Sequence, residues 1–273
     1  MSTAGGHSER WSLLTTRVLA PNAGPMTLDG TNTYVIRAPG AESVVVVDPG
    51  PNLAEHLDRI ETLGPVALVL LTHHHADHSE SIATIAGRTG APVRSADPAL
   101  CINGAPLQDG EVIEAAGTRI VVVATPGHTA DSLCFHLPED RATGADHTSG
   151  SMLTGDTVLG RGTTILARPD GSLRDYLRSL EILRDFPGAD LVLPGHGPAL
   201  PRLSDVVAVY IAHRRERLAQ VTAALSALGI TASQDDEVVK QVTDAVYPNT
   251  DASVRFAAEA STYAQLVYLT SAP

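Results

Sequence analysis

Residues 72–78 read THHHADH, which places four histidines and one aspartate in seven consecutive positions of a chain with 11 histidines in 273 residues. The stretch follows VALVLL (66–71), whose continuous apolar character predicts a strand buried on both faces. Loops at the ends of such strands often carry functional side chains. The pattern His73-x-His75-x-Asp77-His78 can turn side chains toward two neighbouring points, so this loop alone could supply ligands to two metal ions.

Three later strand ends each carry a ligand-type residue in a turn that contains glycine. They are His128 in TPGHTADSL, Asp156 in LTGDTV and His196 in LPGHGP. Glycine beside the ligand lets the backbone turn sharply and brings a short side chain toward a metal ion. A single histidine in such a turn is usually only a turn residue. In combination with the histidine cluster, the three turns predict one metal centre.

Outside these turns, residues 32–203 alternate β-branched runs with amphipathic helical patterns. The runs predict strands at 43–48, 66–72, 119–125, 132–137, 151–155 and 190–194. Helical spacing predicts helices over 53–63, 81–90 and 171–186. The last of these has a capping box at Ser172 and Asp175 and a leucine stripe typical of core packing. This alternation predicts a layered α/β domain.

From Ser204 onward the strand pattern disappears. Periodic apolar residues predict three helices over 204–229, 235–247 and 252–269. We therefore expect two parts, an α/β catalytic domain over 12–203 and a small helical subdomain over 204–273.

Composition and charge exclude several classes of protein. No apolar run approaches the roughly 20 residues needed to cross a bilayer, which indicates a water-soluble globular protein without a membrane span. The formal net charge of −12 repels polyanions and disfavours nucleic acid as a partner. The start, MSTAGGHSERW, lacks the features of a secretory signal peptide, so we expect a cytoplasmic location. The sequence does not determine the oligomeric state.

Four other residues with metal-binding or thiol chemistry have no predicted role in the site. Cys101 and Cys134 have apolar neighbours and no metal-ligand spacing, which indicates small buried side chains. His136 and His147 lie on or beside a polar, glycine-containing loop at 138–151, and we expect both to be structural or solvent-facing.

The order HxHxDH, then a separated His, Asp and His, closely resembles the metallo-β-lactamase-fold hydrolases. The resemblance covers roughly residues 12–203 and implies a four-layer αββα sandwich with the metal site at one edge between two sheets. The implied ligands of one metal ion are His73, His75 and His128. The implied ligands of the other are Asp77, His78 and His196, with Asp156 bridging the two ions. Asp48, in VVDPG, matches the family's early aspartate, and we interpret it as a residue that orients the metal ligands rather than as a plain turn residue.

Asp156 places the chain nearer one branch of this family. True β-lactamases have cysteine at that position, whereas the glyoxalase II-like branch has aspartate, so antibiotic hydrolysis is disfavoured as the main role. The stretches APNAGPMTLDGTNTYVI, PGHTADSL and IAHRRER resemble the subgroup of the mitochondrial β-lactamase-like endoribonuclease and fungal polyketide thioesterases. That subgroup adds a winged-helix-like C-terminal subdomain. Residues 204–273 match its helices but leave little room for the β-hairpin wing.

HRRER (213–217) is the basic cluster of the predicted subdomain. Helical spacing puts His213, Arg214 and Arg217 close to one face. Two interpretations stay open at this point: a solvated helix face, or an anion-recognising rim of the active-site cleft that binds substrate.

The implied centre suggests a mechanism. Two divalent cations that share an oxygen lower the pKa of bound water from about 15.7 toward about 7. We expect a metal-bridging hydroxide to attack a carbonyl carbon or a phosphorus, with Asp77 binding metal and also transferring a proton. Imidazole and carboxylate ligands without a thiolate predict zinc, with iron or manganese as alternatives.

The leading functional hypothesis is a metal-dependent hydrolase of a small ester or thioester, whose anionic group meets Arg214 or Arg217. Cleavage of single-stranded RNA is an alternative that the negative charge and the missing wing weaken. A mononuclear-iron sulfur dioxygenase is another, whereas a flavodiiron protein is excluded because no flavodoxin-like segment follows. A non-catalytic interaction protein is disfavoured, since such relatives usually lose ligands and this sequence keeps all seven.

Overall fold

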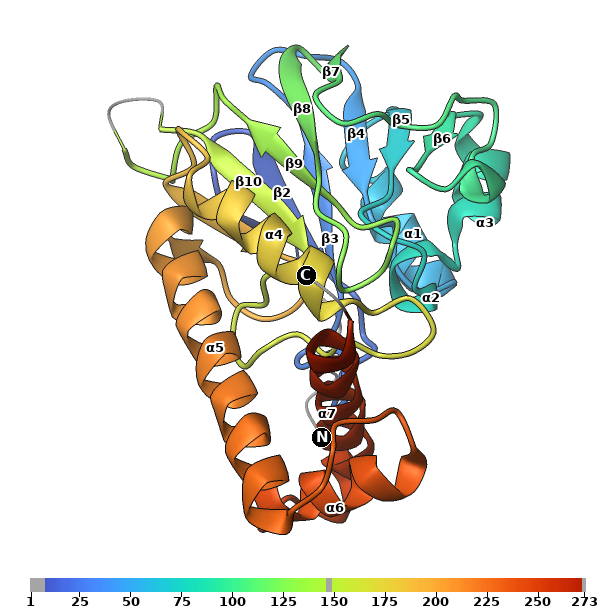
Figure 1. Cartoon of the computed structure of the whole chain (residues 1–273). Coiled ribbons are helices and arrows are strands. Elements are labelled where there is room, and N and C mark those ends of the chain that lie inside the picture. The colour runs from blue at the N-terminus through green and yellow to red at the C-terminus, as the bar shows by residue number, and fades with distance from the viewer. Residues whose placement is uncertain (1–7, 146–148, 272–273) are drawn as a thin grey trace, which may run out of the picture.

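The structure is a computed structural model that describes residues 8–145 and 149–271, so His147 lies outside the described residues. Two six-stranded sheets pack face to face, and helices lie on their outer faces (Figure 1). The first sheet contains, in spatial order, β1 (Ser8–Arg10), β2 (Thr15–Leu19), β3 (Asn32–Ile36), β4 (Val44–Val47), β5 (Val66–Leu70) and β6 (Val93–Arg94). The second contains β12 (Leu200–Pro201), β11 (Leu191–Pro194), β10 (Ser151–Gly155), β9 (Leu133–Leu137), β8 (Thr118–Ala124) and β7 (Val112–Ala115).

The helices form the outer layers. They are α1 (Ala54–Glu61), α2 (Ala76–Ser79), α3 (Ile82–Thr89), α4 (Leu173–Arg184), α5 (Leu203–Leu228), α6 (Asp236–Val246) and α7 (Arg255–Thr270). Two short 3-10 helices, Pro98–Leu100 and Ala252–Val254, lie between them. α1 and α3 share a core with the first sheet, while α4 and the first half of α5 share one with the second.

Burial in the four layers explains the sequence pattern. Strands between a helix layer and the opposite sheet have two apolar faces, and every residue of β3, β4, β9 and β10 is buried. The core between the sheets joins Ile36 and Leu70 of the first sheet to Phe135 and Leu153 of the second. Ladder pairing is parallel for β4–β5 and β10–β11, so these strands end at the same edge as their neighbours.

The predicted αββα class is confirmed. The strands predicted from β-branched runs correspond to β4, β5, β8, β9, β10 and β11, and the predicted helices correspond to α1, α3, α4, α5, α6 and α7. Ser172 caps α4 by accepting a hydrogen bond from the Asp175 N–H at 3.3 Å. Gly90 and Gly229 end α3 and α5 in the left-handed conformation, with φ of 72° and 64°. β1, β2, β3, β6, β7, β12 and α2 were not predicted.

The minor interpretations have mixed outcomes. Cys134 is buried, which raises the pKa of its thiol to about 12, but Cys101 is only partly buried, contrary to expectation. His136 is buried on β9, and its Nε2–H donates to the Gly188 carbonyl at 2.6 Å, as a structural histidine should.

The C-terminal helices leave the sheets and then fold back. α5 begins beside α4 and runs away from the sheets, α6 lies at the far end, and α7 returns toward α4 (Figure 1). A separate small core around Val221, Val242 and Leu266 is enclosed by α6, by α7 and by the second half of α5. Among the described residues, those after Pro201 form no strand. The division at 203/204 stays a prediction. None of the described helices is long and apolar enough to span a membrane.

Candidate metal centre

The seven predicted ligands come together where four strands end. His73, His75, Asp77 and His78 follow β5, and the other three follow β8, β10 and β11. Their ligand atoms form three overlapping groups in which all atoms lie within 4.8 Å of one another. These groups are His73/His75/His128, His73/His78/Asp156 and Asp77/His78/His196.

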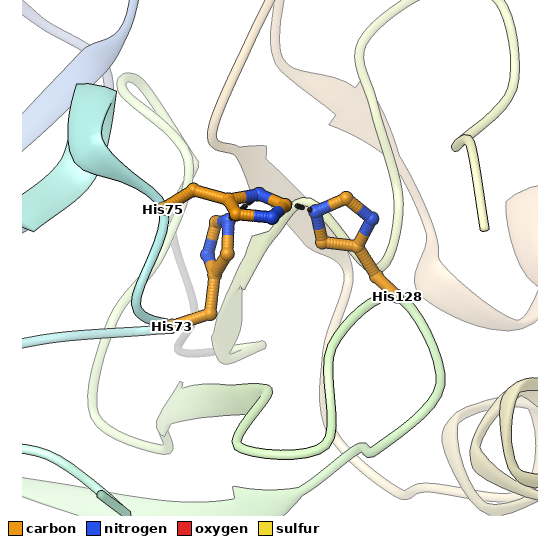
Figure 2. A group of neighbouring side chains, drawn as sticks. All are labelled: His73, His75 and His128. Atoms are coloured by element: carbon orange, nitrogen blue, oxygen red, sulfur yellow. Dashed lines mark hydrogen bonds between the residues drawn. The ribbon is translucent and has the colours of Figure 1, made fainter. Parts of the chain in front are cut away.

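The first group contains three imidazoles from two loops. His75 Nδ1 lies 3.1 Å from His73 Nε2 and 3.1 Å from His128 Nε2, and Figure 2 shows the three rings turned toward one another. A neutral ring nitrogen has either one proton or one lone pair. His75 Nδ1 therefore cannot make a normal hydrogen bond to both partners, and the cluster fits three lone pairs directed at one cation.

The second group is joined to the first by Asp156. His196 Nε2 lies 3.3 Å from His78 Nε2 and 3.2 Å from Asp77 Oδ2. Asp156 Oδ1 lies 3.5 Å from His78 Nε2, and its Oδ2 lies 3.8 Å from His128 Nε2. Asp156 Oδ1 is also buried without a hydrogen-bond partner. A buried carboxylate oxygen needs a compensating partner, so this atom too fits a cation.

Electrostatics separate the two groups. In the first, burial and then the neighbouring imidazoles hold the pKa of His73 well below its usual value and lower the pKa of His75 to about 4. These two rings are therefore neutral near pH 7. Neutral imidazoles keep the lone pair that a metal ion requires.

In and beside the second group, the carboxylates of Asp77 and Asp156 favour positive charge on their neighbours. Burial alone would raise the pKa of Asp77, but the imidazoles of His78 and His196 hold it well below its usual range. Burial opposes charging of His196, yet Asp156 and Asp77 raise the pKa of its ring to about 9. Protons supply this positive charge when no cation is bound, and a divalent ion would replace them.

Several groups outside the cluster orient the rings. Asp48 is buried, and its Oδ2 accepts hydrogen bonds from His78 Nδ1 at 2.8 Å and from the Thr72 hydroxyl at 2.6 Å. Its Oδ1 accepts from the Thr72 N–H at 2.8 Å. His128 Nδ1 donates to the Ile165 carbonyl at 2.8 Å. Each such bond leaves Nε2 as the free ligand atom of its ring. Asp48 thus contacts the ring of His78 from the side away from the cluster, and its orienting role stays a prediction.

Two further contacts were not predicted. The Thr31 hydroxyl donates to Asp77 Oδ2 at 3.1 Å. His74, the second histidine of the cluster, turns to Asp131, with 2.8 Å between its Nδ1 and Asp131 Oδ1. Both partners lie inside stretches that carry the family resemblance, GTNTYVI and TPGHTADSL, but only the fold shows what they contact.

The three substrate-binding candidates lie beside residues 163–165, the loop whose Ile165 carbonyl supports His128. His213, Arg214 and Arg217 of α5 line one pocket, which confirms that they share a face. Arg214 is only 4% exposed, with its guanidinium over the Tyr176 ring and its Nη2 donating to the Thr164 carbonyl. A solvated helix face is therefore wrong for Arg214.

Gly195 gives a prediction about the packing of the centre. A methyl group there would lie 2.5 Å from Asp156 Oδ1 and 2.8 Å from His78 Cε1. Gly195→Ala should therefore displace both side chains and weaken metal binding by about 10- to 100-fold, as loss of ligand support typically does. Metal titration of the purified protein measures this change. Gly87→Ala is the control, because its added methyl meets nothing within 4 Å. Equal metal affinity in G195A and the parent would contradict the geometry.

Comparison with known proteins agrees with this arrangement. The family model described as the metallo-beta-lactamase superfamily matches residues 26–196, which include all seven clustered residues. A beta-lactamase-like protein 2 homolog of Caenorhabditis elegans is 31% identical over 263 residues, covering 92% of this chain and 82% of that protein.

Two further matches bear on activity and fold. An atrochrysone carboxyl ACP thioesterase of Aspergillus fumigatus is 34% identical over 224 residues, covering 77% of this chain. The chain spans 64% of the length of that thioesterase. The crystal structure of a metallo-beta-lactamase family protein from Thermus thermophilus is 25% identical with a TM-score of 0.69, covering 95% of this chain and 92% of that one.

Proposed function

The chain belongs to the metallo-β-lactamase superfamily as a metallo-β-lactamase-like hydrolase, and we propose that it cleaves a small ester or thioester with two bound divalent cations. One observation carries the proposal: two groups of ligand atoms share the carboxylate of Asp156. We propose His73, His75 and His128 as ligands of one ion. Asp77, His78 and His196 would hold the other, with zinc as the metal.

When bound, the cations would lower the pKa of a water molecule and polarise the scissile carbonyl. The chain's own residues then position and move protons. Asp77 keeps 28% of its side chain exposed, against 12% for Asp156, so Asp77 is the more accessible of the two proposed carboxylate ligands. The Thr31 hydroxyl holds its Oδ2 in place. We propose that the Asp77 carboxylate takes the proton released by the attacking water and passes it to the departing thiol or alcohol.

Substrate class rests on two kinds of support. The relative from Aspergillus fumigatus is a thioesterase by name, which favours a thioester. The net charge of −12 disfavours a polynucleotide. The test is a panel of acyl thioesters run beside a labelled single-stranded RNA oligomer. Thioester turnover without RNA cleavage supports the proposal, and RNA cleavage without thioester turnover would overturn it.

Metal removal should abolish this activity. Dialysis against a chelator leaves the two carboxylates without their cations, so thioester turnover should fall to background and return when zinc, iron or manganese is restored. The melting temperature should also fall, because a ligand that binds the native state stabilises it by about 4 kcal/mol at roughly 1,000 times its Kd. Elemental analysis and thermal denaturation of the same samples measure both effects. Full turnover by a metal-free sample would rule out a metallohydrolase.

A further inference from the structure

The pocket lined by His213, Arg214 and Arg217 lies between the segment that supports the centre and the C-terminal helices. We call it the cap pocket; it has a volume of about 290 Å³ and is lined by residues 163–165, by α5 and by the segment from Tyr247 to Ser261. Its charged or titratable lining residues include His213, Arg214 and Arg217, and hydroxyl groups of Tyr247 and Ser261 are also present. Of the described residues that line it, none is acidic. This is a strong local bias in a chain with a formal charge of −12.

Two lining side chains have unused polar atoms. Arg214 is 96% buried, counted from its 4% exposure, and its Nε has no hydrogen-bond partner. His213 Nδ1 is likewise buried without a partner. Folding leaves such groups unpaired only at a cost, so their presence points to a ligand that completes them.

The positive charge in the cap pocket affects the pKa of His213. Burial, and then the charges of Arg214 and Arg217, lower the pKa of His213. Arg217 is held in position over the Tyr247 ring, 5.2 Å from its centre, and its Nη1 donates to Gln220 at 2.8 Å. Positioned guanidinium groups are the preferred partners of carboxylates and phosphates, because their donors match two oxygens at once.

The cap pocket also touches the supports of the metal centre. The Thr164 hydroxyl donates to the Asp156 carbonyl at 2.5 Å, and the Ile165 carbonyl accepts from His128 Nδ1 at 2.8 Å. Residues 163–165 therefore have the cap pocket on one side and two proposed ligands on the other. An anion in the pocket lies close to the proposed reaction centre without being at it.

We infer that the cap pocket binds an oxyanion, a phosphate or carboxylate group that the substrate carries away from its scissile bond. The inference rests on the proposed function for the identity of that substrate. Arg214 and Arg217 hold the anion, and the segment 163–165 sets its distance from the metal centre. The preferred substrates are then acidic thioesters or esters.

Matched substrates test the inference. One pair of acyl thioesters differs by a single phosphate on the thiol side, and a second pair differs by a free or esterified carboxylate on the acyl side. For the preferred pair, the parent protein should show a ratio of kcat/KM, charged over neutral, of about tenfold or more. Arg217→Gln should bring that ratio close to one. Which pair responds identifies the source of the anion.

Arg215→Gln is the matched control, because Arg215 lies on the same helix but is 65% exposed and pairs with Glu181 at 3.5 Å. The control removes the same charge and should keep the charged-over-neutral ratio of the parent. Thioester turnover with a ratio near one in the parent for both pairs would overturn the inference while leaving the proposed hydrolase intact. A ratio equally high in R217Q and the parent would overturn it as well.

A binding measurement separates the inference from catalysis. Methyl phosphate and propionate are titrated into the full-length parent, R217Q and R215Q, and the shift in melting temperature is followed. At least one anion should stabilise the parent and R215Q more than R217Q. This result without turnover of any ester or thioester would support the pocket and refute the proposed function. Equal shifts in all three proteins would refute the pocket.

Discussion

Asp77→Asn is expected to lower kcat by about 10²- to 10⁴-fold, the range associated with loss of one positioned proton-transfer group. Asparagine has the same size but cannot accept or release the proton, and it is a weaker metal ligand. The pKa of Asp77 lies well below its usual range because of His78 and His196, so the parent carries a carboxylate at every physiological pH. Steady-state kinetics on the best thioester of the panel measure the effect.

The fold should tolerate this substitution. Asp77 lies on the four-residue helix α2 and is partly exposed, and an amide oxygen can still accept from the Thr31 hydroxyl. Circular dichroism should therefore resemble that of the parent, and so should thermal denaturation when both proteins are saturated with metal. Asp170→Asn, at the outer histidine His74, is the control and should leave kcat close to that of the parent. Unchanged turnover in D77N with intact metal content would remove Asp77 from the mechanism.

Asp48→Asn is expected to weaken metal binding at the Asp77/His78/His196 group by at least about 10- to 100-fold. Asp48 has a φ of 51°, which asparagine also adopts readily, so the backbone should be unaffected. An amide NH₂ placed toward His78 Nδ1 cannot accept its proton. The ring then favours the tautomer with its proton on Nε2, which removes the lone pair from the metal side.

The control for Asp48 is another buried aspartate. Asp140 accepts hydrogen bonds from the Ser12 and Ser151 hydroxyls, each at 2.6 Å. Ser151 begins β10, so this site is at the end of the strand away from the metal centre. Asp140→Asn should lower the free energy of unfolding by roughly 1–3 kcal/mol, because it disturbs buried hydrogen bonds, without changing metal affinity. Metal titration with a chromophoric chelator compares the two variants. If D48N binds metal as tightly as the parent, the orienting role assigned to Asp48 is wrong.

Much of the fold can be predicted from local pattern. Strands β4 and β5 are continuous apolar runs, which double burial in a sandwich requires, and α4 has both its cap and its apolar stripe in the sequence. β2 and β3 were missed because TTRVL and NTYVI mix polar and apolar residues without clear alternation. In β3 the polar Asn32 is buried and donates to the Pro194 and Gly197 carbonyls. That long-range contact makes a polar residue acceptable in a buried strand.

The candidate centre was predictable for a different reason. Its ligands follow strand ends, and strand ends meet at one edge of a sandwich. The pattern of residue types at those ends was therefore enough to predict that seven side chains lie close together. The cap pocket was predictable only in part. Helical spacing put His213, Arg214 and Arg217 on one face, but the burial of Arg214 depends on Tyr176 and Thr164, which lie far from it in sequence. Contacts of this kind follow from tertiary packing and leave no local pattern.

The central claim is that one chain holds two divalent cations among these seven side chains. Anomalous diffraction at metal absorption edges, from crystals of protein purified without added metal, tests it most directly. We predict two metal peaks, one beside His73, His75 and His128 and one beside Asp77, His78 and His196, with Asp156 next to both. A single iron at the first position, or no peak after growth in metal-replete medium, would contradict this claim.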